Sequence, residues 1–128
     1  MDILQTLRDD YQKFPDDQTY CIYAETVYFK DPMNEFRGRD RYQQTIKFIK
    51  TWFLNVKMDL HNIQQLDDLI RTDWTLSWNT PLPWKPRIAI DGWSELQVAE
   101  DLIISHIDYW HCSKLDVLKQ HFFSHRST

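Results

Sequence analysis

The sequence predicts an α+β fold, in which helices in the first half of the chain pack against a curved antiparallel sheet in the second half. Apolar side chains recur at helical spacing in the longest segments before residue 54, and after Asn55 they alternate with polar ones. Helices followed by a run of strands are typical of α+β domains. A chain of 128 residues has the length of one domain, so we expect a single domain over residues 1–128.

The N-terminal half predicts three helices and one short strand. The expected elements are a helix over residues 1–14, a short helix over 20–24, a strand over 26–29 and a long helix over 39–54. Pro15 ends the first helix, and Asp16 or Asp17 can cap the second. The strand is a β-branched and aromatic run that leads into a turn at Asp31 and Pro32.

The C-terminal half predicts four long strands and a short C-terminal helix. The strands are expected at residues 56–60, 70–78, 88–98 and 102–111. Sequential strands joined by short turns pair as an antiparallel meander. The proline-rich segment 80–86 cannot supply a ladder of N–H donors and is expected to be a loop, and Ser113 caps the closing helix.

Alternation also predicts which side chains share a face of the sheet. Trp74 and Trp78 lie on one face of the second long strand, and His106 and Asp108 share one face of the last strand with Ile104. Aromatic residues make up 15% of the chain and include six tryptophans. Large rings bury much area and often line pockets, so we expect an aromatic cavity.

Charge and cysteine content narrow the classes of function and location. The net charge of −4 and the pI near 5.6 argue against nucleic acid as a partner, because that binding needs a basic face. No segment is long enough to cross a bilayer and the N-terminus lacks a secretory signal, so we expect no membrane association. Cys21 and Cys112 have no paired spacing, and we expect them to be reduced and buried in a cytoplasmic protein.

Several motifs point to a known superfamily. They are Val27–Pro32 followed by Phe36 and Gly38, then Trp74, Gly92–Ser94 and Ile103–Trp110. With the order of elements, they resemble the nuclear transport factor two-like superfamily, whose members include SnoaL-like polyketide cyclases, ketosteroid isomerases and scytalone dehydratase. Within it the chain is most similar to an uncharacterised branch found in photosynthetic organisms.

The resemblance implies a cone-shaped, cystatin-like α+β barrel in which a bent sheet wraps the helices and leaves a cavity at the wide end. It also implies a homodimer formed through the outer face of the sheet. It does not imply one activity, because this scaffold carries enzymes, carriers and interaction domains.

Asp31 is one candidate catalytic residue. In the ketosteroid isomerases that the chain resembles, the aspartate of a similar Asp-Pro pair is the general base. Burial beside an apolar cavity would raise the pKa of such a carboxyl toward the range of proton shuttling. Alternatively, Asp31 only turns the chain and accepts hydrogen bonds from nearby backbone N–H groups.

His106 and Asp108 are a second candidate, because they are one two-residue repeat, about 7 Å, apart along the same strand face. They form either an acid/base pair in the cavity or a structural hydrogen-bonded pair on an exposed or dimer-facing side. His111 would lie on the opposite face, so we expect no convergent metal site.

We therefore expect a cavity that binds a small apolar molecule or a protein partner without a metal or other cofactor. The residues expected to contact the ligand are Tyr23, Tyr28, Trp74, Trp78, Ser94 and Trp110. One alternative is a cofactor-free isomerase, cyclase or dehydratase that uses Asp31 as its base with help from His106 or Asp108. Another is a homodimeric interaction module whose pocket is filled by aromatic side chains.

Overall fold

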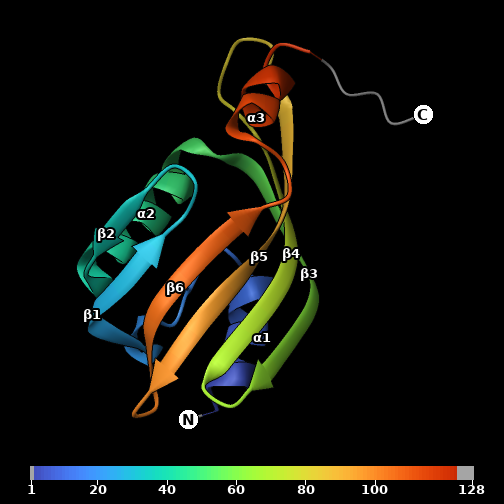
Figure 1. Ribbon diagram of the computed structural model, residues 1–128. Helices are drawn as coiled ribbons and strands as arrows, with labels where there is room; N and C mark the ends of the chain where they lie inside the picture. Colours follow the sequence, from blue (N-terminus) through green and yellow to red (C-terminus); the bar gives the residue numbers. More distant parts are fainter. Residues whose placement is uncertain (1, 124–128) are drawn as a thin grey trace.

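A curved sheet wrapped around two helices forms the body of the molecule, and a third short helix sits at one end of it (Figure 1). The computed structural model describes residues 2–123. The helical elements are α1 (Ile3–Gln12), the 3-10 helix η1 (Tyr20–Ile22), α2 (Arg39–Trp52) and α3 (Lys114–Gln120). The strands are β1 (Tyr23–Lys30), β2 (Glu35–Arg37), β3 (Leu54–Leu66), β4 (Leu69–Asn79), β5 (Arg87–Ala99) and β6 (Leu102–Trp110).

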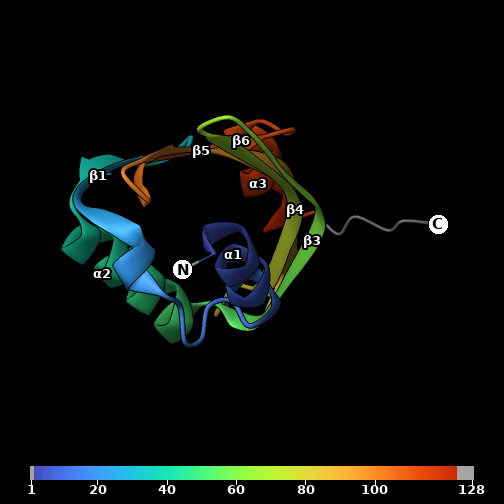
Figure 2. The ribbon, with the colours of Figure 1, turned by 90° about the horizontal axis from the view of Figure 1, so that it is seen from below.

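The sheet is mixed, with strand order β2-β1-β6-β5-β4-β3. Strands β3 to β6 form the expected antiparallel meander, but β1 pairs in parallel with β6. The predicted α+β cone with an antiparallel sheet in the second half of the chain is confirmed, and the parallel pairing of β1 makes the whole sheet mixed. Hairpin-connected strands must run antiparallel, whereas β1 reaches β6 only through a long crossover, which permits parallel pairing. Seen end-on, the sheet curves around α1, and α2 closes the opposite side (Figure 2).

Two irregularities change which residues face inward. The register shifts between Leu60 and Asn62 on β3, so Ile63 is buried although alternation from Leu60 would turn it outward. A second shift occurs on β6, where Ile103 and Ser105 oppose adjacent residues of β5. Ile104 is therefore 39% exposed, and the prediction that it shares the face of His106 is wrong.

The main hydrophobic core lies at the end of the sheet that holds the β3–β4 and β5–β6 hairpins. Ile70, Leu96 and Ile103 of the sheet are completely buried against α1 and α2, which contribute Leu7 and Ile46. A second cluster surrounds Trp74, Trp78, Ile88 and Ile90 toward the end where α3 lies. The apolar faces predicted for β4 and β5 are confirmed.

The connections show how local residues define the element ends. The short helix predicted at 20–24 is only the 3-10 turn η1, and its N-cap is Thr19, which makes no side-chain cap, rather than Asp16 or Asp17. The backbone N–H and the hydroxyl of Thr19 both donate hydrogen bonds to the carboxylate of Asp10 on α1. Ser113 caps α3 as predicted, through a capping box with Asp116.

Both cysteines are free thiols, but Cys21 is exposed and Cys112 is half-buried, so the prediction that they are buried is wrong. Cys21 lies in η1, whose buried side chain is that of its neighbour Ile22. None of the helices within residues 2–123 has the length and apolar character needed to cross a membrane.

Candidate functional site

A cavity of about 700 Å³ lies between the concave face of the sheet and the three helices. Its walls are mostly apolar and aromatic, and its volume lies in the range of small-molecule sites. Phe53, just after α2, stacks on Trp78 of β4 with ring centroids 4.4 Å apart. Leu115 and Leu118 of α3 line the same space and are largely exposed, so α3 borders its open end.

Gly92 makes room for the indole of Trp74 in the cavity wall. Trp74, Gly92 and Trp110 lie side by side on β4, β5 and β6. A Cβ atom at Gly92 would collide with the Tyr109 carbonyl oxygen and would lie 2.8 Å from the Trp74 ring. The missing side chain lets the indole lie across β5, where its Nε1–H donates a 2.8 Å hydrogen bond to Ser94 Oγ.

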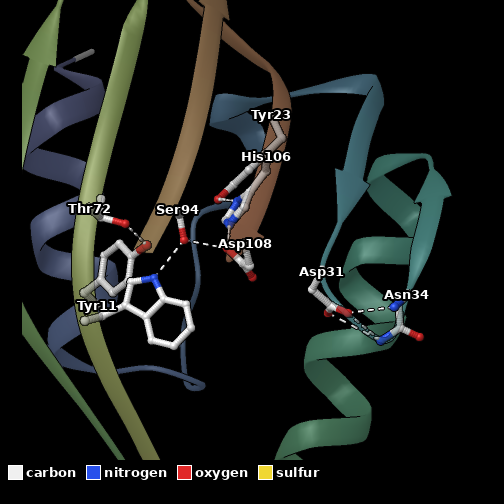
Figure 3. A network of polar contacts seen from close by, with 9 residues as sticks. Tyr11, Tyr23, Asp31, Asn34, Thr72, Ser94, His106 and Asp108 are labelled. Carbon is white, nitrogen blue, oxygen red and sulfur yellow. Dashed lines mark hydrogen bonds and ion pairs between the residues drawn. The ribbon is translucent and has the colours of Figure 1, made fainter. Parts of the chain in front are cut away.

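Ser94 links Trp74 to a buried polar network on β5 and β6 (Figure 3). Its hydroxyl donates to Asp108 Oδ1 at 2.5 Å, and His106 Nε2 lies 2.7 Å from the same oxygen. On the other side of the imidazole, Nδ1 is 3.5 Å from the Tyr23 hydroxyl. Since an ionised carboxylate only accepts, His106 donates to it from Nε2.

The second carboxylate oxygen of Asp108 faces the cavity. Both hydrogen bonds of the carboxylate go to Oδ1, and no residue in the described part of the chain donates to Oδ2. The Asp108 side chain is 20% exposed, compared with 8% for His106. Asp108 is thus positioned by two donors and keeps one oxygen free to accept a hydrogen bond from a molecule in the cavity.

Three buried tyrosines surround the network as neutral hydrogen-bond donors. Burial raises the pKa of Tyr11, Tyr23 and Tyr42 well above the ordinary value of 10.0, and the nearby charge of Asp108 raises each of them further. Tyr11, on α1, also exchanges a 2.7 Å hydrogen bond with Thr72 on β4, which ties the helix to the sheet. These phenols therefore remain protonated at neutral pH.

Asp31 lies apart from this network, in the turn between β1 and β2 (Figure 3). Its Oδ1 accepts 2.7 Å hydrogen bonds from the backbone N–H groups of Met33 and Asn34, which is the turn geometry considered from the sequence. The residue also lines the cavity, and burial raises the pKa of its carboxyl although these hydrogen bonds oppose the shift. One of its two oxygens is thus committed to the turn.

The structure brings most of the predicted site residues to one cavity. Those that line it are Tyr23, Asp31, Trp74, Trp78, Ser94, His106, Asp108 and Trp110. His106 and Asp108 form the hydrogen-bonded pair considered from the sequence, but they face inward rather than an exposed or dimer-facing side.

The prediction that Tyr28 contacts a ligand in the cavity is wrong. Tyr28 lies outside the cavity, and its hydroxyl donates to Glu35 on β2. The reason is the alternation of β1, whose neighbouring residues Val27 and Phe29 are buried and therefore turn Tyr28 outward. The same pattern was readable in the sequence.

The structure also adds residues that sequence reasoning missed. Phe53 follows the end of α2 and Thr72 lies on the inner face of β4, and neither type of residue has a motif of its own. Within residues 2–123, no three histidine, cysteine, aspartate or glutamate side chains converge in a way that would hold a metal ion.

Known structures share this architecture at low sequence identity. A Catenulispora acidiphila protein with a ketosteroid isomerase-like fold, solved in complex with trimethylamine, has a TM-score of 0.75 at 15% identity, covering 94% of this chain and 92% of its own. A protein classed as a SnoaL-like polyketide cyclase from Jannaschia has a TM-score of 0.75 at 9% identity, covering 95% and 92%. An epoxide hydrolase of the LEH-like type from M. tuberculosis has a TM-score of 0.71 at 13% identity, covering 91% and 86%.

These similarities establish the nuclear transport factor two-like cone fold and leave the activity open. A comparison with curated protein sequences finds no match. The model of one protein family, described as an uncharacterized conserved protein (DUF2358), matches residues 1–106. The chain belongs to the DUF2358 family.

Proposed function

We propose that the cavity binds a small, largely apolar molecule that carries one hydrogen-bond donor. The observation that supports this most directly is Asp108, whose Oδ2 is free to accept at the inner wall of an otherwise aromatic cavity of about 700 Å³. Binding sites for small molecules typically combine apolar walls with a few well-placed polar groups. The Catenulispora relative, solved with trimethylamine, is consistent with small-molecule binding in this fold.

Binding of a neutral dye tests this proposal. Nile red fluoresces in apolar surroundings, so wild-type protein should raise its emission with saturable binding. Leu76→Trp, which enlarges a half-buried side chain of the cavity wall, should weaken that binding by about tenfold or more. Gln97→Trp is the matched control, because Gln97 is exposed on the outer face of β5. Absence of saturable binding by wild type, or equal binding by both variants, would refute the proposal.

A second candidate is proton-transfer catalysis in the same cavity, of the isomerase, cyclase or dehydratase kind. The geometry favours Asp108 as the base over Asp31, because Oδ2 of Asp108 accepts from no described residue whereas Oδ2 of Asp31 lies 3.4 Å from Asn34 Nδ2. A panel of small unsaturated ketones and secondary alcohols, followed by ultraviolet absorbance, provides the test. Turnover should disappear in Asp108→Asn and survive in Asp31→Asn, and the reverse pattern would assign the base to Asp31.

We also propose that the outer face of the sheet forms a homodimer. Trp93 on β5 stacks on Tyr109 with centroids 4.9 Å apart and contacts His111 at 4.7 Å, and the Arg71 guanidinium lies 5.2 Å from its ring. Aromatic residues and arginine are enriched in protein interfaces. This cluster of Arg71, Trp93, Tyr109 and His111 would lie at the centre of the contact.

A further inference from the structure

We infer that the molecule bound in the cavity is a cationic amine with an apolar body, whose ammonium group donates to Asp108 Oδ2. The inference rests on the proposed binding function and adds the chemical class of the ligand. It follows from the charge that the cavity leaves unbalanced, from the free acceptor and from the aromatic surfaces beside it.

Among the described residues, Asp108 has no arginine or lysine partner. The two groups that hold its Oδ1 are the hydroxyl of Ser94 and the imidazole of His106. The other imidazole nitrogen, Nδ1, lies 3.5 Å from the Tyr23 hydroxyl. Oδ2 is therefore the acceptor that the carboxylate presents to the cavity.

The remaining charged residues of the wall do not neutralise it. Among the described lining residues there is no arginine, and the one lysine is Lys114, an exposed residue of α3 at the open end. His121, the lining histidine besides His106, is hydrogen-bonded to Thr80 and to the Val117 carbonyl. Asp10 and Asp31 add further carboxylates to the wall. Asp10 is occupied by Thr19, and Asp31 by its own turn. Low-dielectric walls strengthen the field of an unbalanced charge, so this cavity attracts cations and repels carboxylates and phosphates.

Aromatic rings beside Asp108 suit an alkylammonium group as well as its apolar body. Trp110 follows Asp108 on the inner face of β6, and Trp74 reaches the network through Ser94. Tryptophan faces attract organic cations through their π electrons. An amine would therefore meet a carboxylate acceptor and indole rings at the same place, whereas a neutral alcohol would use only the hydrogen bond and the apolar walls.

Three ligands that share one carbon skeleton test this charge preference. Phenylbutylamine, phenylbutanol and phenylbutyrate are titrated against bound Nile red at about pH 8, where the amine is a cation and the acid an anion. We expect the amine to displace the dye about tenfold more tightly than the alcohol, and the alcohol about tenfold more tightly than the acid. Asp108→Asn should reduce the amine to the affinity of the alcohol, while Asp59→Asn, which removes a carboxylate that pairs with Lys57 and does not line the cavity, should preserve the preference.

The outcomes separate the two proposals. If the alcohol displaces Nile red and the amine binds no more tightly than the acid, the charge inference is wrong while the binding cavity stands. If wild-type protein binds neither the dye nor any of the three ligands, the proposed function fails and the inference fails with it. The wild-type ratio of amine to acid needs no variant, so misfolding of Asp108→Asn would leave the test intact.

Discussion

Replacing Gly92 with alanine tests how the sheet accommodates Trp74. The added Cβ would be 2.8 Å from Cη2 and 3.1 Å from Cζ2 of the Trp74 ring, and it would also collide with the Tyr109 carbonyl. Both ring distances are shorter than ordinary van der Waals contacts. Because one neighbour is backbone and the other a buried ring, neither can move away without cost.

The expected destabilisation has two sources. Overpacking of a well-packed core typically costs about 1–3 kcal/mol. If the indole moves aside, its N–H loses Ser94, and a buried unsatisfied donor costs about 1–3 kcal/mol more. For a chain of this length each 1 kcal/mol lowers Tm by about 4 °C, so Gly92→Ala should melt about 8–24 °C below wild type.

Thermal and urea unfolding followed by circular dichroism measure the effect, with Trp74→Phe as the partner in a double-mutant cycle. Phenylalanine removes the indole N–H and the outer part of the ring, so the double variant should recover about 1 kcal/mol or more relative to additive costs. A Gly92→Ala variant that melts within about 2 °C of wild type, or strict additivity in the cycle, would refute this account of the contact.

Three further predictions concern ionisation, the turn and the interface. Burial raises the pKa of Tyr11 and Tyr42 above the unfolded value of 10.0, so the stability they contribute is complete below pH 10 and is lost as pH rises above it. Ultraviolet titration should show their ionisation only together with unfolding, and ionisation of all tyrosines near pH 10 in folded protein would contradict this. Asp31→Ala should lower the free energy of unfolding by about 1–3 kcal/mol, because it removes the acceptor of two turn N–H groups; an unchanged urea midpoint would argue against the turn role. Trp93→Glu should yield a monomer in size-exclusion chromatography with light scattering where wild type elutes as a dimer, and a monomeric wild type would end the dimer proposal.

Much of the fold was predictable because its signals are local. The apolar stripe that contains Tyr42 and Ile46 predicted α2, and strict alternation predicted the buried faces of β4 and β5. The period of a helix or strand is set by backbone geometry, so a side chain's face follows from its position in the segment. The same rule correctly placed His106 and Asp108 on one face of β6.

Alternation along a strand failed to predict the structure where pairing with a strand distant in the sequence decided it. The bulge at Ile104 reverses the alternation between Ile103 and His106, and nothing in residues 102–106 announces it, because it arises from pairing with β5. The parallel pairing of β1 with β6 is of the same kind, since it depends on how the long crossover packs. Tyr28 differs, because its outward position followed from the buried neighbours Val27 and Phe29.

The sequence by itself thus determined α1, α2, α3 and the four long strands, the inner faces of β4 and β5, and the shared face of His106 and Asp108. Only the tertiary structure decided that Ser94 meets Asp108, that Trp74 crosses Gly92 to reach Ser94, and that one carboxylate oxygen opens into a cavity. Those contacts depend on the register between neighbouring strands, which is set by backbone hydrogen bonds along the whole curved sheet. No short segment of the chain contains that information.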